Sequence, residues 1–215
     1  MNAATDNITA QNFFTKLLQL KFLKPLVFIL CLLPMALLVQ GAINGTLGVN
    51  PVETLIREMG DWAIYFLLMT LSITPLRALL NLSWLIKCRR MLGLFSFFYA
   101  CLHFVSFIWF EHFFDLTEIV KDIIKRPFIT IGFVCLLMLS ALAVTSTDNM
   151  IRRLKKRWKT LHQLVYPIAL LALLHYFMMI KADYQHPLIL LVWLVALFGY
   201  RYYVFLKKVK KTTHD

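Results

Sequence analysis

Charged residues are scarce in this sequence, and long apolar runs take their place. Only 16% of its 215 residues are Asp, Glu, Lys or Arg, 60% are hydrophobic, and the mean hydropathy is +0.70. Soluble domains carry roughly 25% charged and 45–50% apolar residues. The composition therefore excludes an ordinary soluble domain and indicates a single domain of the lipid bilayer.

Cysteine is also sparse, and the 4 cysteines are isolated from one another along the chain. There is no C-x-x-C and no C-x-x-C-H, which excludes a zinc ribbon, a thioredoxin-type dithiol and covalently attached c-type haem. The P-loop, G-x-G-x-x-G and H-E-x-x-H patterns are missing too, so nucleotide hydrolysis and metalloprotease chemistry have no support. No internal repeat and no low-complexity segment is evident in the sequence.

Six apolar segments have the length that a helix needs to cross a bilayer, about 17–25 residues. They are continuously apolar rather than alternating, which excludes a β-barrel, and an apolar span that is not part of a barrel must be helical to satisfy its backbone in lipid. We therefore expect an all-α integral membrane bundle in which short connections make consecutive helices antiparallel neighbours. The expected transmembrane spans are residues 25–43, 61–80, 91–110, 127–146, 161–180 and 187–206.

The 23 Lys and Arg residues are distributed unevenly between the two sides of this bundle. Most of them precede the first span, flank the loop around 77–90, fill the loop at 152–159 or follow residue 200, whereas most acids fall in the alternate loops. The positive-inside rule then places both termini in the cytoplasm. The basic loops are interpreted as topology signals and contacts with membrane lipid, not as a nucleic-acid surface.

This topology predicts three regions along the chain. Residues 1–24 form a cytoplasmic N-terminal segment, and its basic stretch at 13–24 either lies along the interface as an amphipathic helix or simply flanks the first span. Residues 25–206 form the six-helix transmembrane domain, and residues 207–215 form a basic cytoplasmic tail.

Three histidines, His103, His162 and His175, lie inside the expected spans. An imidazole in hydrocarbon needs a partner in the protein interior, and haem iron between helices is a metal that readily takes several histidines. At 1.5 Å per residue, His103 lies roughly 18 Å and His175 roughly 21 Å from the cytoplasmic starts of their spans. This matched depth on two helices favours the ligation of one haem by both histidines. His162 lies near the cytoplasmic end, where a second redox centre would complete an electron path.

Two features leave the inner site open. His162 and His175 are turned about 140° apart on an ideal helix, unless Pro167 kinks that helix. Arg89 and Arg90 stand at the level where a second inner histidine would be needed. An intramembrane histidine can also serve only as a hydrogen-bonding partner of a neighbouring helix. The remaining three histidines lie at outer span ends or in the tail and are expected to be solvated: His112, His186 and His214.

Five blocks of the sequence carry a specific resemblance to a known family, and they cover most of residues 44–205. In order, they are NPVETLIREMGDWAIYFLLMTLSITPLR (50–77), RRMLGLFSFFYACLHF (89–104), KRPFITIGF (125–133), ALAVTST (141–147) and WKTLHQLVYPIALLALLHY (158–176). These blocks resemble the MsrQ family, formerly YedZ. Its members are haem-binding membrane subunits of bacterial MsrPQ methionine-sulfoxide reductase systems, within the ferric-reductase-like transmembrane family.

The resemblance implies b-type haem, one or two per chain, and FMN as cofactors. It carries the family's axial ligands of haem iron onto His103, His162 and His175. It also implies electrons from the quinone pool or from a cytoplasmic flavin reductase, and a periplasmic molybdopterin-containing subunit that repairs methionine sulfoxide in envelope proteins. The basic loop at 152–159 and the TST stretch at 145–147 are candidates for the FMN phosphate, which needs positive charge and donors.

We therefore expect an electron-transfer subunit of the bacterial inner membrane rather than a catalytic subunit, in which the cofactors supply the redox chemistry. Two alternatives stay open: a stand-alone ferric-reductase-like cytochrome b, and a small proton-coupled transporter. The first usually carries a fused flavin and nicotinamide domain, whereas this chain ends shortly after its last span. The second is expected to show internal repeats and interrupted helices.

Overall fold

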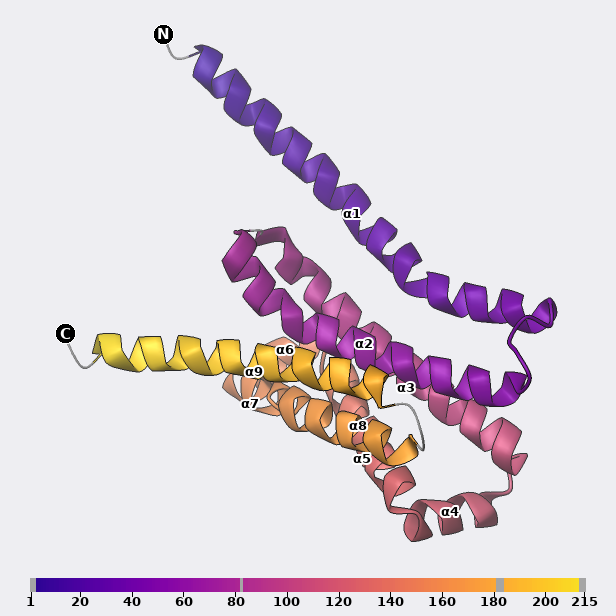
Figure 1. The fold of residues 1–215 in the computed structure, drawn as a ribbon. Helices are drawn as coiled ribbons and strands as arrows, with labels where there is room; N and C mark the ends of the chain where they lie inside the picture. Colours follow the sequence, from indigo (N-terminus) through magenta and orange to yellow (C-terminus); the bar gives the residue numbers. More distant parts are fainter. Residues whose placement is uncertain (1–2, 82, 181–183, 213–215) are drawn as a thin grey trace.

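The structure, a computed structural model, describes residues 3–81, 83–180 and 184–212 (Figure 1). Every regular element in these ranges is helical, which confirms the all-α expectation. In chain order the elements are α1 (Ala3–Ile43), α2 (Pro51–Leu80), the short 3-10 helix η1 (Ser83–Leu85), α3 (Ile86–His112), α4 (Leu116–Lys125), α5 (Pro127–Val144), α6 (Asp148–Leu154), α7 (Lys156–His162), α8 (Val165–Met179) and α9 (Gln185–Thr212).

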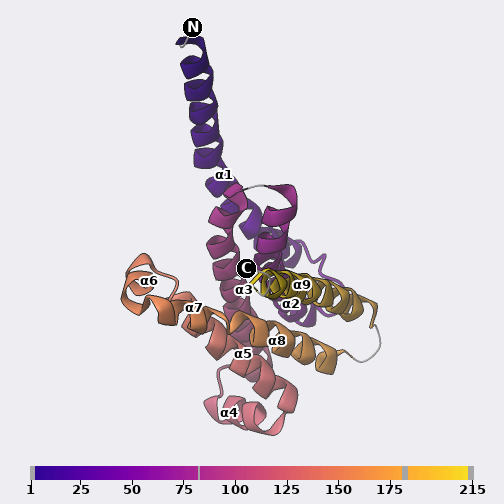
Figure 2. The same cartoon turned by 90° about the vertical axis from the view of Figure 1, so that its left-hand side faces the viewer.

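Six helical segments are long and apolar enough to cross a membrane, which confirms the number of expected spans. They are Phe22–Ile43, Pro51–Leu80, Ile86–His112, Pro127–Val144, Lys156–Met179 and Gln185–Lys210. Helix α2 packs along α3, and α5 packs along α8. Helix α4 lies across one end of the bundle and α6 lies at the opposite end, so we call these the α4 end and the α6 end (Figures 1 and 2).

Helix α2 begins at Pro51, well before the expected start near residue 61, because local capping rather than hydropathy sets its first turn. The side chain of Asn50 accepts a hydrogen bond from the backbone N–H of Glu53 at 3.3 Å, which satisfies one of the orphan donors of a helix start. Pro51 follows at the first helical position, where its missing N–H costs nothing. The added turns carry Ile56 and Gly60 into the helix, and both belong to the site described below.

The fifth span is divided into α7 and α8, as the position of Pro167 suggested. Pro167 has no N–H to offer to the carbonyl of Gln163 and would clash with it in a continuous helix. The backbone tightens there, and the N–H groups of Gln163 and Leu164 donate to carbonyls three residues earlier, at 3.1 and 3.0 Å. The break changes the angular relationship between the start and the end of the fifth span.

Helix α1 bends away from the bundle, and its N-terminal part extends beyond the other helices (Figures 1 and 2). Pro25 and Pro34 lie in its interior. The hydroxyl of Tyr99 on α3 donates to Cys31 O at 2.9 Å and accepts from Met35 N–H at 3.1 Å. Those two backbone groups would pair with each other in an undisturbed helix, so a proline and an inserted side chain together account for the bend.

The larger buried core lies between α2, α5, α8 and α9, and the outward faces are apolar. Leu71 of α2 and Ile168 of α8 are fully buried in a cluster that also includes side chains of α5 and α9. In contrast, Ile29 of α1 and Val192 of α9 are 64% and 68% exposed. Apolar side chains that face outward all along spanning helices are what a lipid environment requires.

Candidate functional site

His103 lies on α3 and is held by α2. Its Nδ1 atom lies 2.7 Å from the backbone carbonyl oxygen of Ile56, which can only accept, so Nδ1 carries the proton and donates. One helical turn further along α2, Gly60 packs against the same ring, and a Cβ atom at Gly60 would lie 3.1 Å from Nδ1. The neutral tautomer that results leaves the lone pair of Nε2 available for a metal.

His175 lies on α8 and is held by α5 in the same manner. Its Nδ1 atom donates to the carbonyl oxygen of Phe128 at 2.7 Å. Gly132, again one turn further along, lies under the ring, and a Cβ atom there would lie 2.9 Å from Cε1 of His175. No hydrogen bond joins Nε2 of His103 or of His175 to any residue that the structure describes.

The two hairpins, α2–α3 and α5–α8, are structural repeats of each other at this site. In both, the histidine and its carbonyl acceptor are 47 residues apart, and each glycine lies one turn beyond the acceptor. Both hairpins begin at the α4 end and return to it. The local geometry around the two histidines is therefore repeated, although few of the paired residues are alike.

The imidazole rings of His103 and His175 face each other across the bundle. Their centroids are 6.2 Å apart, and the ring planes are inclined by 78°. Two metal–imidazole bonds of about 2 Å each, together with the two half-rings, span about 6 Å. A hydrogen bond from Nδ1 to a backbone carbonyl is the usual way in which proteins orient a ligating histidine. The pair therefore fits a single metal between two histidines, such as a haem iron.

His162 lies apart from this pair, at the end of α7 near the α6 end. Its ring stacks on Trp158 at 4.0 Å between centroids. Its Nε2 atom lies 3.2 Å from Oγ1 of Thr145, and this hydroxyl already donates to Ala141 O at 2.7 Å. Nε2 therefore carries the proton and donates to Thr145. His162 therefore differs from the other two histidines, whose Nδ1 atoms donate to a backbone carbonyl and leave Nε2 free of hydrogen bonds to the described residues.

The two arginines expected at the level of His162 have different surroundings. Arg90 forms an ion pair with Asp148, 2.6 Å between Nη1 and Oδ1, and both side chains are substantially exposed. Arg89 lies close enough to His162 to interact with it electrostatically. Of the two, Arg89 is therefore the one that interacts electrostatically with His162.

The two segments that sequence analysis proposed for a flavin phosphate are both near the α6 end. The hydroxyl of Ser146 donates to Leu142 O at 2.7 Å, and that of Thr147 caps α6 by accepting from Met150 N–H at 3.4 Å. These hydroxyls are therefore engaged locally. The basic loop forms the wall of an open surface depression of about 520 Å³, which is lined by residues 153–157. Four of these five residues are Arg or Lys.

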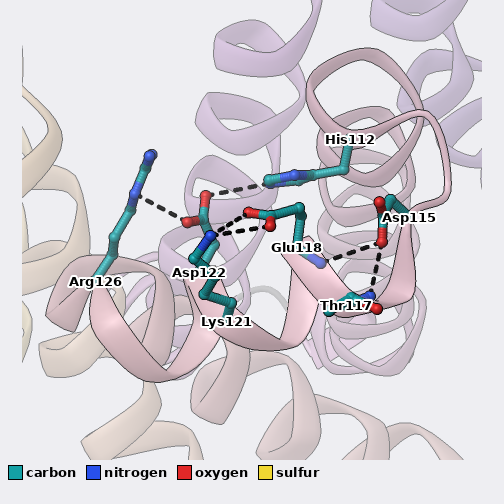
Figure 3. Close-up of polar contacts among 7 residues, drawn as sticks. All are labelled: His112, Asp115, Thr117, Glu118, Lys121, Asp122 and Arg126. Atoms are coloured by element: carbon teal, nitrogen blue, oxygen red, sulfur yellow. Dashed lines mark hydrogen bonds and ion pairs between the residues drawn. The ribbon is translucent and has the colours of Figure 1, made fainter.

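A polar cluster at the α4 end joins α3, α4 and α5 (Figure 3). Asp122 lies 3.3 Å from His112 Nε2 through one carboxylate oxygen and 3.3 Å from Arg126 Nε through the other. We call these three residues the α4 strap. The prediction that His112 is solvated is wrong, because α4 folds back over the end of α3 and leaves its side chain only 12% exposed. On the exposed side of α4, the carboxylate of Glu118 raises the pKa of Lys121.

The α4 strap lies close to the histidine pair along the chain. His112 ends the helix that carries His103, and Arg126 is the N-cap of α5, two residues before the carbonyl that orients His175. Asp122 therefore fixes the start of α5 relative to the end of α3. The sequence does not predict that Asp122 joins the end of α3 to the start of α5, because the folding of α4 over α3 leaves no local signal in the sequence.

His186 is exposed, as expected, but its imidazole is also hydrogen-bonded. Its Nε2 and Nδ1 atoms lie 2.6 Å from the hydroxyl of Tyr65 and 2.7 Å from that of Tyr176, although the residue remains exposed. These hydrogen bonds tie the start of α9 to α2 and α8. His214 lies outside the described residues.

The six-helix fold and the histidine pair define a class of protein, the ferric reductase-like transmembrane components. The family of that description matches residues 59–173, from just before Gly60 to just before His175. Over 174 residues, the chain is 54% identical to the protein-methionine-sulfoxide reductase heme-binding subunit MsrQ of Herminiimonas arsenicoxydans, and the match covers 80% of each chain.

Two further relatives bear the same description. The Rhodospirillum rubrum protein is 50% identical over 164 residues, covering 76% of this chain and 79% of its own. The Bordetella pertussis protein is 45% identical over 181 residues, covering 83% and 88%. The chain belongs to the MsrQ family, which confirms the resemblance seen in the sequence. No solved structure matches the chain.

Proposed function

We propose that the chain is a transmembrane haem protein that passes electrons to a methionine-sulfoxide reductase. The observation that carries this proposal is the facing pair of His103 and His175, each oriented by a backbone carbonyl. The relatives support it, because their names describe heme-binding subunits of such a reductase.

In this proposal His103 and His175 hold the iron of one b-type haem, which supplies reversible one-electron chemistry when bound. The carbonyls of Ile56 and Phe128 keep both rings in the tautomer that presents Nε2. Gly60 and Gly132 leave room for the rings, and the apolar helices exclude water from the site. The protein thus sets ligand identity, orientation and dielectric, which are its means of tuning a haem potential.

His162 supplies the ligand of a second redox centre near the α6 end. For this role its Nε2–H must leave Thr145, or Nδ1 must serve as the ligand instead. FMN is the second cofactor in the proposal, and its phosphate would find positive charge in the depression formed by residues 153–157. Electrons would enter there, from the quinone pool or from a cytoplasmic flavin reductase, and leave at the α4 end.

The charge distribution supports the direction of this path. The basic residues concentrated around 77–90, 152–159 and after residue 200 place the α6 end in the cytoplasm by the positive-inside rule. The α4 end then faces the periplasm of a bacterial inner membrane, where a molybdopterin-containing reductase subunit would dock. A stand-alone ferric reductase-like cytochrome b is the second candidate, because the match of residues 59–173 to the ferric reductase-like family fits both functions.

A redox spectrum of the purified protein with defined partners tests the function. In proteoliposomes, dithionite reduction should give the split α-bands of b-type haem, and addition of the oxidised periplasmic reductase with methionine sulfoxide should reoxidise them. The His186→Ala variant is a matched control, since this histidine lies at the same end but outside the pair. Haem that is reoxidised by ferric citrate but not by the reductase would favour the second candidate, and a protein without haem would overturn both.

A further inference from the structure

Arg201 on α9 points into the bundle rather than out to water. Its Nη2 donates to Leu71 O at 2.9 Å and its Nη1 to the hydroxyl of Tyr166 at 2.8 Å, with the guanidinium carbon 5.0 Å from the centre of the Tyr166 ring. Leu71 O is the carbonyl that Pro75 cannot serve, because proline has no N–H for the bond to the residue four positions earlier. The Nη2 group of Arg201 donates to Leu71 O in place of the missing backbone N–H.

A neutral donor could also form the hydrogen bond to Leu71 O, so this bond does not explain the positive charge of Arg201. Most of the N–H groups of Arg201 also have no partner within the part of the chain that the structure describes. Its Nε atom is buried and has no hydrogen-bond partner among the described residues. A guanidinium carries five N–H donors, and the structure employs two of them. An arginine that served only to lie along the surface would extend its head to the interface instead.

A second arginine interacts electrostatically with the first. Arg89 on α3 is close enough to Arg201, Tyr166 and His162 for electrostatic interaction with each of them. Neither Arg89 nor Arg201 forms an ion pair with a carboxylate among the described residues, whereas Arg57, Arg90 and Arg126 each do.

Two guanidinium groups with no counter-charge are costly in this position. Both residues are partly buried, which removes part of the solvation of each ion, and the like charges repel each other. Ionisable groups inside a membrane domain are normally paired or mark a functional pathway. The arrangement therefore lacks a negative partner, and Arg89, which interacts electrostatically with both Arg201 and His162, links this charged pair to the His162 site.

We propose that Arg89 and Arg201 bind an anionic group, a carboxylate or a phosphate, of the cofactor carried beside His162. This inference rests on the proposed function, which places a redox cofactor there. Arginine suits either anion because its planar fork can form two parallel hydrogen bonds to it. The hydroxyl of Tyr166, which accepts from Arg201, retains its own proton for a further bond to the same anion. The two sources of such a group are the propionates of a haem and the phosphate of FMN.

Binding to matched charged and neutral ligands tests this site. The full-length protein in nanodiscs of neutral lipid is titrated with FMN and with riboflavin, which lacks the phosphate. It is also reconstituted with haem and with haem dimethyl ester, which lacks free carboxylates. Arg89→Gln and Arg201→Gln are compared with Arg90→Gln, a neighbouring exposed arginine that is paired with Asp148. Arg201→Lys retains the charge without the fork, and Tyr166→Phe leaves both arginines in place.

The wild type should prefer one charged ligand over its neutral analogue by about tenfold or more, as a charge-assisted hydrogen bond allows. Preference for FMN over riboflavin identifies the phosphate, and preference for haem over its ester identifies the propionates. Arg89→Gln and Arg201→Gln should lose this preference, Arg201→Lys and Tyr166→Phe should keep part of it, and Arg90→Gln should keep all of it.

Equal binding of charged and neutral ligands by the wild type, or an unchanged preference in both Gln variants, would overturn the anion site. An effect that appears only when anionic lipid is added would overturn it as well, since the partner would then be a lipid headgroup. The absorption spectrum of the protein reports independently whether His103 and His175 hold haem. Its absence from the wild type would contradict the proposed function rather than the anion site.

Discussion

The imidazoles of His103 and His175 face each other at 6.2 Å between ring centroids, and each donates from Nδ1 to a carbonyl of the neighbouring helix at 2.7 Å. The carbonyls of Ile56 and Phe128 are part of helix backbones, so they cannot turn away when a ligand is absent. The protein alone therefore sets both the spacing and the tautomer of the pair. A site prepared in this manner loses little freedom when it binds a metal.

The close approach of the glycines to the rings should make alanine costly there. A Cβ atom at Gly132 would lie 2.9 Å from the His175 ring, and one at Gly60 would lie 3.1 Å from the His103 ring. Overpacking of this kind costs about 1–3 kcal/mol, so Gly132→Ala should lower the haem content per chain, and Gly60→Ala should do so less. Gly199→Ala is the control, because nothing lies within 4 Å of that position. Full haem content in Gly132→Ala would show that the ring can move.

Loss of the carboxylate in the α4 strap should loosen the α4 end. Asp122→Asn removes the negative charge that lies between His112 and Arg126, and the side chain of Asp122 is only 13% exposed. His112 is 12% exposed and Arg126 is 55% exposed, so the loss falls mainly on the contact with His112. A lost hydrogen-bonding or ionic partner of a buried group costs about 1–3 kcal/mol, and thermal unfolding in detergent should shift downward. Glu118→Gln breaks the solvent-exposed pair with Lys121 on the same helix, and water screens such a pair so well that its loss should leave the unfolding temperature nearly unchanged. Equal shifts in both variants would contradict a special role of Asp122.

The hydroxyl of Tyr99 should hold α1 against α3. Tyr99→Phe leaves Cys31 O and Met35 N–H without the group that bridges them, at a cost of about 1–3 kcal/mol. Amide hydrogen exchange should therefore increase around residues 31–35 and little elsewhere. Tyr202→Phe alters a tyrosine that is 64% exposed and should leave this exchange unchanged. Unaltered exchange at 31–35 in Tyr99→Phe would mean that the helix closes its own hydrogen bond there.

Thr145 competes with any metal for Nε2 of His162. Replacement by the near-isosteric valine removes a hydrogen bond worth about 0.5–1.5 kcal/mol, so a cofactor ligated by Nε2 should bind His162 more tightly in Thr145→Val. His162→Ala should lose that cofactor, and the ratio of cofactor to chain measures both effects. Weaker binding in Thr145→Val would show that the hydroxyl orients the ring for ligation instead of competing for it.

The sequence predicts the membrane class, the six spans and the shared level of His103 and His175, because hydropathy and helical rise depend on local residue order. It does not predict Ile56 and Phe128 as the groups that orient the rings. Any residue can present a backbone carbonyl, so side-chain identity carries no signal for that role. The equal spacing from Gly60 to His103 and from Gly132 to His175 is a signal that could have been found.

Contacts between segments that are distant in the sequence explain why the structure differs from the sequence-based expectations at other residues. His112 looks solvated in the sequence because it ends an apolar run, yet the return of α4 over α3 buries it against Asp122. The sequence places Arg201 in a basic segment at the end of a span, where a solvent-exposed side chain is expected. In the structure its side chain points inward instead, because Pro75 leaves Leu71 O without a backbone donor and Arg201 donates to it. In both cases the partner is chosen by the packing of helices, which hydropathy alone does not specify.

Electron paramagnetic resonance of the oxidised protein tests the central claim most directly. The wild type should show a low-spin ferric signal of the type that two imidazole ligands give, and His103→Ala and His175→Ala should each lose the same signal, because both histidines hold one iron. His186→Ala should retain it. Persistence of that signal in either His103→Ala or His175→Ala would contradict the pairing on which the proposed function depends.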